Sequence, residues 1–117
     1  MRDFKKLKVW HKAHELTLDI YKVTRDFPKE EIYGITSQLR RASSSIEFNL
    51  SEGCGRESEK ELKRFAIISM GSASELECEL LLSFDLKYIG NIDYKRLEKK
   101  TIEVKKMLSS FIVKLRN

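Results

Sequence analysis

The stretch that decides the fold is Leu97-Glu-Lys-Lys-Thr-Ile-Glu-Val-Lys-Lys-Met-Leu-Ser-Ser-Phe-Ile-Val-Lys-Leu115. Steps of four and three residues alternate along it without a slip, at Leu97, Thr101, Val104, Leu108, Phe111 and Leu115. This spacing keeps one side of an α-helix apolar, and it is typical of the seam along which bundled helices pack. Lysine and glutamate fill most positions between them as far as residue 106, which suits a face in water. The stretch therefore predicts a bundle helix.

Two further amphipathic segments lie at the start of the chain. The first covers about residues 7–27, and proline at 28 ends it because proline disfavours helix at the residue before it. The second covers about residues 29–53, with a possible interruption at Gly34. Their predicted inner faces are Trp10, Ala13, Leu16, Thr17, Ile20, Thr24 and Phe27, and Ile35, Leu39, Ala42, Ile46, Asn49, Leu50 and Gly53.

The third segment opens with Ser58-Glu-Lys-Glu61, the spacing of a capping box, and is expected to reach Ile89 before Gly90 stops it. Asp93 is the predicted N-cap of the fourth helix, residues 93–116. Short loops between long helices imply antiparallel neighbours. We therefore predict an all-α, antiparallel up-down-up-down four-helix bundle, with residues 1–117 as one domain.

Composition agrees with this fold. The chain has 117 residues, 41% hydrophobic and 35% charged, with only five glycines and one proline, too few turn formers for a many-stranded β fold. It carries no apolar run of about 20 residues and no signal peptide, so we expect a cytoplasmic protein that avoids membranes. We interpret Cys54 and Cys78 as reduced thiols, with Cys78 packed.

The third segment carries a second apolar stripe opposite its core face. A helix that is apolar on two sides either lies at the centre of a fold or packs against a partner. Every helix of a four-helix bundle is peripheral, so the stripe predicts a homo-oligomer. The interface candidates on it are Ile67, Gly71, Cys78, Leu82 and Ile89.

Positive charge gathers at the two ends of the chain. Residues 1–30 carry a net charge of +3 and residues 91–117 carry +5, whereas the middle of the chain is acidic. If the terminal helices lie side by side, their charges form one surface suited to a polyanion. Lysine is a flexible point charge that suits phosphate contacts. The nucleic-acid-binding candidates are Lys5, Lys8, Lys12, Lys95, Lys99 and Lys106. The alternative is ordinary solvated helix faces with an excess of lysine.

The outer face of the second segment carries the small hydroxyl residues Ser37, Ser44 and Ser45 beside Arg41 and Phe48. Small side chains permit close approach, and an arginine and an aromatic ring are common anchors at interfaces. The partner is a subunit, a protein client or a nucleic acid. An exposed Phe48 without any partner is the alternative.

Catalytic and metal-binding patterns are weak. His11 and His14 are three residues apart, but no Glu-x-x-His pair or metalloprotease spacing accompanies them, so we interpret them as solvated. Glu77 at the core edge is expected to pair with Arg40, Arg41 or a hydroxyl. Asn49 is interpreted as a buried residue that fixes helix register. We predict no enzyme, no metal and no cofactor.

Several motifs, in this order, resemble one family: Leu7-Lys-Val-Trp-His-Lys-Ala-His14, Phe27-Pro-Lys-Glu-Glu31, Tyr33-Gly-Ile-Thr-Ser-Gln-Leu-Arg-Arg-Ala42, Asn49-Leu-Ser-Glu-Gly53 and Glu75-Leu-Glu77. They resemble the four-helix proteins encoded in intervening sequences of bacterial 23S ribosomal RNA genes. The resemblance covers about residues 4–90. The pair Ser45-Ile46 also resembles that family, but where the family commonly has a proline after this pair, the chain has Glu47. Ser51 replaces a more usual alanine.

The resemblance implies a subunit often assembled as a homopentamer, with no established enzymatic activity. It also implies kinship with the accessory protein of diversity-generating retroelements, which binds nucleic acid and a reverse transcriptase. The leading hypothesis is accordingly an oligomeric, non-catalytic binder of RNA or other nucleic acid. The alternative is a protein-interaction scaffold, for example an accessory subunit for a reverse transcriptase.

Overall fold

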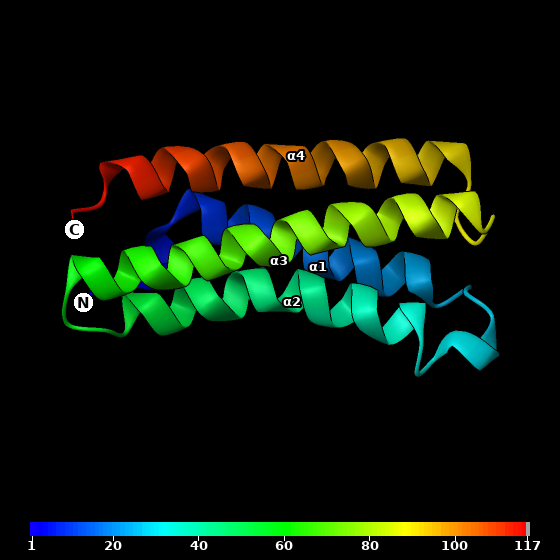
Figure 1. Cartoon of the computed structure of the whole chain (residues 1–117), viewed down its shortest axis with the longest axis horizontal. Helices are drawn as coiled ribbons and strands as arrows, with labels where there is room; N and C mark the ends of the chain where they lie inside the picture. The colour runs from blue at the N-terminus through cyan, green and yellow to red at the C-terminus, as the bar shows by residue number, and fades with distance from the viewer. Residues whose placement is uncertain (117) are drawn as a thin grey trace.

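The computed structural model describes residues 1–116 as an all-α, up-down-up-down four-helix bundle (Figure 1). Asn117, the last residue of the predicted domain, lies outside the described residues. The four helices are α1 (Lys8–Thr24), α2 (Ile35–Cys54), α3 (Glu59–Asp85) and α4 (Asn91–Lys114), with short 3-10 turns at Phe4–Lys6 and Lys29–Glu31. Each helix runs opposite to the one before it, as the colour gradient in Figure 1 shows. The predicted fold class is confirmed.

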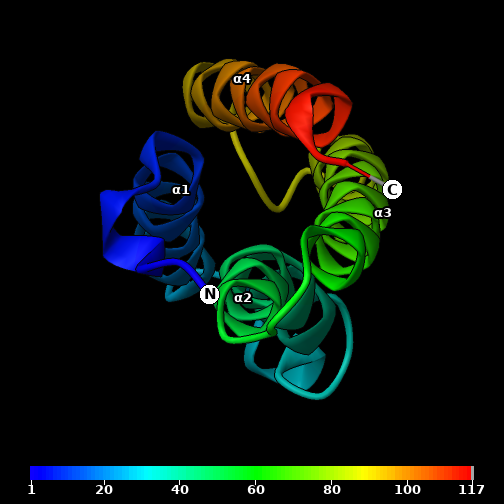
Figure 2. The same ribbon diagram turned by 90° about the vertical axis from the view of Figure 1, so that its left-hand side faces the viewer.

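The helices stand at the corners of a square (Figure 2), where α1 contacts α2 and α4, and α3 contacts α2 and α4. Each helix turns its apolar face toward the centre, since burying that face is the main favourable term in folding. The α4 seam is confirmed at Leu97, Thr101, Val104 and Leu108, none of them more than 1% exposed. Facing them are Ala13, Leu16, Leu39, Ile46, Leu50, Leu76 and Leu80.

The first connection differs from the prediction. The first helix ends at Thr24, three residues before the expected end, and Phe27 turns inward to meet the ring of Tyr88 at 5.6 Å. Gly34 is the N-cap of α2, so the second helix begins at Ile35 and not at residue 29. Pro28 has an extended backbone, which separates the two helices by a 3-10 turn.

The end of the third helix also differs. Ser58 caps its start as predicted, because its side chain accepts the backbone N–H of Glu61 at 3.2 Å. The helix ends at Asp85, because Lys87 adopts a left-handed conformation, with φ at 67°. Tyr88 N then donates to the carbonyl of Ser83 at 3.0 Å, which makes a Schellman motif. The motif normally shows itself in sequence as a glycine, and this chain has lysine there.

That early turn has two consequences. Ile89 folds back over the end of the core and is only 5% exposed, so its predicted place on the outward stripe is wrong. The fourth helix begins at Asn91 with Gly90 as its N-cap, so Asp93 is not the cap. Asp93 lies in the first turn, where its negative charge is favourable near the helix N-terminus.

The tightest helix pair is α2 and α3. Ser69 Oγ donates to the carbonyl of Ile46 at 2.8 Å across this contact. Near the end of α2, a Cβ on Gly53 would lie 2.9 Å from Phe65 Cβ, so only glycine permits this approach. Asn49 is half-buried and donates to the Ser45 carbonyl of its own helix at 2.8 Å. The prediction that Asn49 is a buried residue was therefore wrong.

Candidate nucleic-acid interface

The basic ends of the chain lie side by side, because α1 and α4 are adjacent corners of the square (Figure 2). Leu16 and Ile20 of α1 and Leu97 and Val104 of α4 point inward. The 3.6-residue period then leaves the lysines of both helices on the outside. The two lysine-rich helices are therefore side by side, which is what a combined basic surface requires.

An acidic residue neutralises the half of this surface near the start of α4. Asp19 accepts bonds from Arg96 and from Lys100, each at 2.8 Å, and Arg96 also bonds Asp93 at 2.6 Å. The hydrogen bond from Arg96, together with that from Lys100, lowers the pKa of Asp19 to about 2 although burial opposes the shift. These basic groups are held in ion pairs and are poorly placed to contact phosphates.

The six predicted nucleic-acid-binding lysines are all exposed, but they do not form one cluster. Lys12 pairs with Glu103 of α4 at 3.5 Å, a distance typical of a weak exposed ion pair. Lys95 and Lys99 lie on the outer side of α4 near its start. Lys106 lies closer to the end of α4, and Lys8 of α1 lies near it. Within residues 1–116, ion pairs are absent at Lys5, Lys8, Lys95, Lys99, Lys106 and Lys114.

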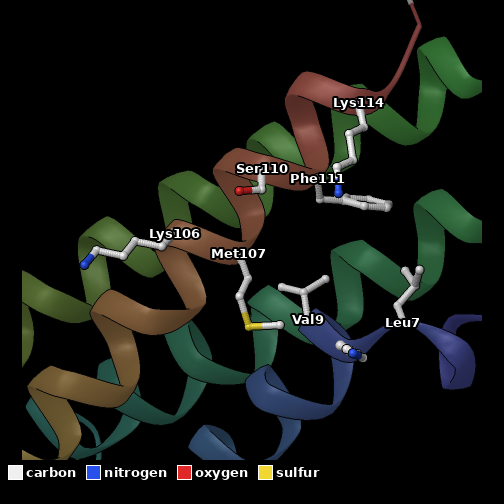
Figure 3. Close-up of a pocket in the computed structure, with 8 residues that line it drawn as sticks. Leu7, Val9, Lys106, Met107, Ser110, Phe111 and Lys114 are labelled. Carbon is white, nitrogen blue, oxygen red and sulfur yellow. The ribbon is translucent and has the colours of Figure 1, made fainter.

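Between the start of α1 and the end of α4 lies a groove of about 350 Å³ (Figure 3). Its floor is apolar and consists of Leu7, Val9, Met107 and Phe111. In Figure 3, Met107 and Phe111 extend from α4 toward Val9 and Leu7. Ser110 and three lysines, Lys8, Lys106 and Lys114, complete the lining. The sequence did not predict this groove, since its two sides are about 100 residues apart in the chain.

Aromatic rings hold the start of α1. Phe4 contacts Trp10 with ring centroids 4.8 Å apart, and Trp10 stacks on the imidazole of His14 at 4.9 Å. His14 Nδ1 lies 2.9 Å from Glu47 Oε2 of α2, and Glu47 is only 5% exposed. Glu47, which departs from the family pattern, therefore joins α1 to α2.

His11 and His14 of α1 make separate contacts. His11 Nε2 meets the carbonyl oxygen of Lys5, whereas His14 points toward Glu47. Among residues 1–116, no group of three histidine, cysteine, aspartate or glutamate side chains is placed to hold a metal ion.

On α2, Phe48 is 63% exposed and Arg41 is also exposed. Ser45, expected on the same outer face, instead lies toward α3, with its Oγ 3.0 Å from Ser72 Oγ. Ser44 donates to the carbonyl of Arg40 at 2.8 Å. Phe48 and Arg41 thus remain the outward-facing pair on this helix.

The apolar stripe of α3 is present, with two corrections. Ile67 is 52% exposed, Leu82 is 48% exposed, and Gly71 has open space beside it. Cys78 is exposed whereas Cys54 is buried, so the prediction of a packed Cys78 is wrong. A cysteine on a helix apolar on two sides is ambiguous from sequence. The second correction is Ile89, which turns inward and is not part of the stripe. The exposed residues Ile68, Leu81 and Leu86 lengthen the stripe.

The glutamates of α3 differ in their surroundings. Glu77 forms the expected ion pair, but its partner is Lys105 of α4, at 2.8 Å, and not Arg40, Arg41 or a hydroxyl. Glu79 is 7% exposed, and its Oε1 has no hydrogen-bond partner among the described residues. Burial, and then the neighbouring Glu75, raise the pKa of Glu79 to about 8. The helical pattern of the sequence did not predict that Glu79 is buried.

Comparison with protein families gives the relationship. The sequence model described as 23S rRNA-intervening sequence protein matches residues 5–110. The chain belongs to that family. The family match extends beyond the residues whose motifs carried the resemblance and includes most of α4.

A solved structure supports the same relationship. This intervening-sequence protein is similar to a crystal structure from Bacteroides thetaiotaomicron, described as a protein with unknown function from the S23 ribosomal protein family. The two are 25% identical, with a TM-score of 0.80, over 89% of this chain and 97% of the other. A comparison with curated proteins found no match. Among residues 1–116, no helix is both long and apolar enough to span a membrane.

Proposed function

We propose that this intervening-sequence protein is a non-enzymatic, cytoplasmic, oligomeric bundle that binds RNA or another nucleic acid through α1 and α4. One observation carries the proposal. The acidic side chains along the α1–α4 contact pair with Lys12, Arg96 and Lys100. Within residues 1–116 they leave other lysines of both helices without acidic partners. Positive charge that the fold does not neutralise is available for an external polyanion.

The arrangement suits phosphate contacts that position a nucleic acid. Lys95, Lys99 and Lys106 share the outer side of α4, at intervals of about 6 and about 10 Å along the helix axis. These intervals allow one strand to meet several lysines. Phosphate contacts of this kind carry no sequence information. We therefore expect binding with little preference among sequences.

The test is a binding titration with fluorescein-labelled RNA at several salt concentrations. The wild-type affinity is expected to fall steeply with salt, because bound lysines displace counterions from the phosphates. A variant with Lys95, Lys99 and Lys106 changed to Gln is expected to reduce the slope of log K against log salt by about 2. Absence of binding by the wild type at low salt would refute the proposal.

The matched control removes the same charge elsewhere. Lys29, Lys60 and Lys87 are exposed and lie outside α1 and α4. Changing these three to Gln keeps net charge equal to that of the first variant. It is expected to leave both affinity and salt slope close to the wild type. Equal losses in both variants would point to a general charge effect and contradict the role of α4.

The oligomeric part of the proposal is supported by the exposed stripe on α3. Ile67, Leu82 and the neighbouring apolar residues form an exposed apolar surface along α3. Extended exposed apolar surfaces mark protein interaction sites. Sedimentation velocity of the wild type at micromolar concentration is expected to show an assembly. Changing Ile67 and Leu82 to Lys is expected to leave a folded monomer, and a wild type that sediments only as a monomer would refute self-association.

A second function is favoured by the exposed pair on α2. Phe48 and Arg41 are the residue types that anchor protein interfaces, and Phe48 is 63% exposed. The corresponding function is a scaffold for a protein client such as a reverse transcriptase. Changing Phe48 to Ser is expected to abolish client capture and spare RNA binding, whereas the change at Lys95, Lys99 and Lys106 does the reverse.

A further inference from the structure

The groove between the start of α1 and the end of α4 combines two properties that the rest of the basic surface lacks. Its floor is apolar, and Lys8, Lys106 and Lys114 are among the residues that line it. In Figure 3 the Lys114 side chain extends toward the Phe111 ring, whereas Lys106 points away from it. Among the described residues, no acidic side chain lines it. A ligand that fits this groove must offer both a flat apolar surface and negative charge.

An unpaired nucleotide has both properties. In a duplex, the bases are stacked and the outside consists of sugars and phosphates, so the apolar floor would stay in contact with water. An unpaired base can lay its face on apolar and aromatic side chains, as bases do in single-strand-binding proteins. We propose that this groove binds an unpaired base of an RNA or DNA strand, with the phosphates beside that base on Lys8 and Lys114. The inference rests on the proposed nucleic-acid binding and gives it a site.

The dimensions of the floor favour a single base over a protein helix. Met107 and Phe111 are one helical turn apart, about 6 Å along the axis of α4. An amphipathic helix in a groove places anchors at positions i to i+7, a span of about 10 Å. The floor is therefore shorter than a helix needs, and it matches one base with its neighbouring phosphates.

The lining also predicts how selective the groove is. Among the described residues, Ser110 is the one uncharged polar side chain of the lining, so few groups are available to bond the edges of a base. Lysine contacts phosphates without distinguishing bases. We therefore expect a clear preference for unpaired over paired strands, and only a weak preference among the four bases.

The experiment compares a labelled 12-nucleotide single-stranded RNA with its 12-base-pair duplex, by fluorescence anisotropy at one salt concentration. Changing Met107 to Ser removes apolar floor without changing charge. It is expected to weaken single-strand binding about fivefold and to leave duplex binding unchanged. The matched control is Val113→Ser on the same helix, at a side chain that is 80% exposed and does not line the groove, and it is expected to change neither.

A second measurement keeps the proposal testable if Met107→Ser disturbs packing. A single strand containing 4-thiouridine is crosslinked to the wild-type protein, and the crosslinked residue is identified by mass spectrometry. Crosslinks at Met107 or Phe111 support the site, and crosslinks confined to the outer side of α4 overturn it.

The outcomes separate this inference from the proposed function. If Met107→Ser weakens single strand and duplex equally, or neither, base capture is wrong. Nucleic-acid binding then still stands, provided that the Lys95, Lys99 and Lys106 variant loses affinity. If the wild type binds neither RNA, both proposals fall. If an acidic amphipathic peptide binds the groove and the single strand does not compete with it, the groove is a protein site and the inference is overturned.

Discussion

Two glycines of this bundle are expected to respond in opposite directions to the same substitution. Gly53 and Gly71 both lie inside helices, where alanine is intrinsically favoured by about 1 kcal/mol. At Gly71 an added Cβ meets nothing within 4 Å. We therefore expect Gly71→Ala to raise the free energy of unfolding of the subunit by about 0.5–1 kcal/mol.

At Gly53 the surroundings reverse the sign. An added Cβ would lie 2.9 Å from Leu62 Cδ1 and 2.9 Å from Phe65 Cβ. The Leu62 methyl can rotate away, but Phe65 Cβ is fixed to its backbone, so α2 and α3 must separate by about half an ångström. Overpacking of this kind costs about 1–3 kcal/mol, and helix propensity offsets less than about 1 kcal/mol of it. The expected net loss is about 1–2 kcal/mol.

The assay is urea unfolding followed by far-ultraviolet circular dichroism, for the wild type and both variants. It is repeated at two protein concentrations, because self-association adds its own free energy to the apparent stability. A midpoint lowered for Gly53→Ala and raised for Gly71→Ala is the expected pattern. If Gly53→Ala is as stabilising as Gly71→Ala, the close approach of α2 and α3 is not a constraint and the reasoning is refuted.

Three further predictions concern charge and backbone conformation. Asp19→Asn is expected to cost about 2 kcal/mol at pH 7, because the folded pKa of about 2 lies below the unfolded value of 3.8. This difference should shrink as the pH falls from 4 to 2; a constant difference in urea unfolding would contradict it. Glu79→Gln has the opposite pH dependence: the raised pKa of about 8 costs the wild type stability as pH rises above 4.5. The variant should thus be clearly more stable than the wild type at pH 7, and the gain should disappear at pH 4. Equal gains at both pH values would count against a neutral buried acid. Lys87→Gly should raise the thermal midpoint through a gain of about 1 kcal/mol, because φ at 67° suits glycine; a lower midpoint would argue against the Schellman turn.

Much of the fold follows from local patterns in the sequence. The alternating steps from Leu97 to Leu108, the capping serine at 58 and the break at Pro28 each depend on neighbours within one helix. Burial confirms the α4 seam and the cap geometry confirms Ser58, whereas the first helix ends at Thr24, before Pro28. The prediction failed where a residue took an uncommon conformation, as Lys87 does, because nothing in its side chain announces a left-handed backbone.

The candidate site depends more on tertiary structure than on local sequence patterns. The sequence by itself determined that both terminal helices are rich in lysine and that the third helix is apolar on two sides. Only the tertiary structure decided which basic groups are neutralised, since Asp19 meets Arg96 and Lys100 across 77 and 81 residues. The groove likewise needs Val9 and Met107 to face one another. Helix periodicity fixes which side of a helix a residue occupies, but the pairing between two helices depends on their register, and only packing sets that.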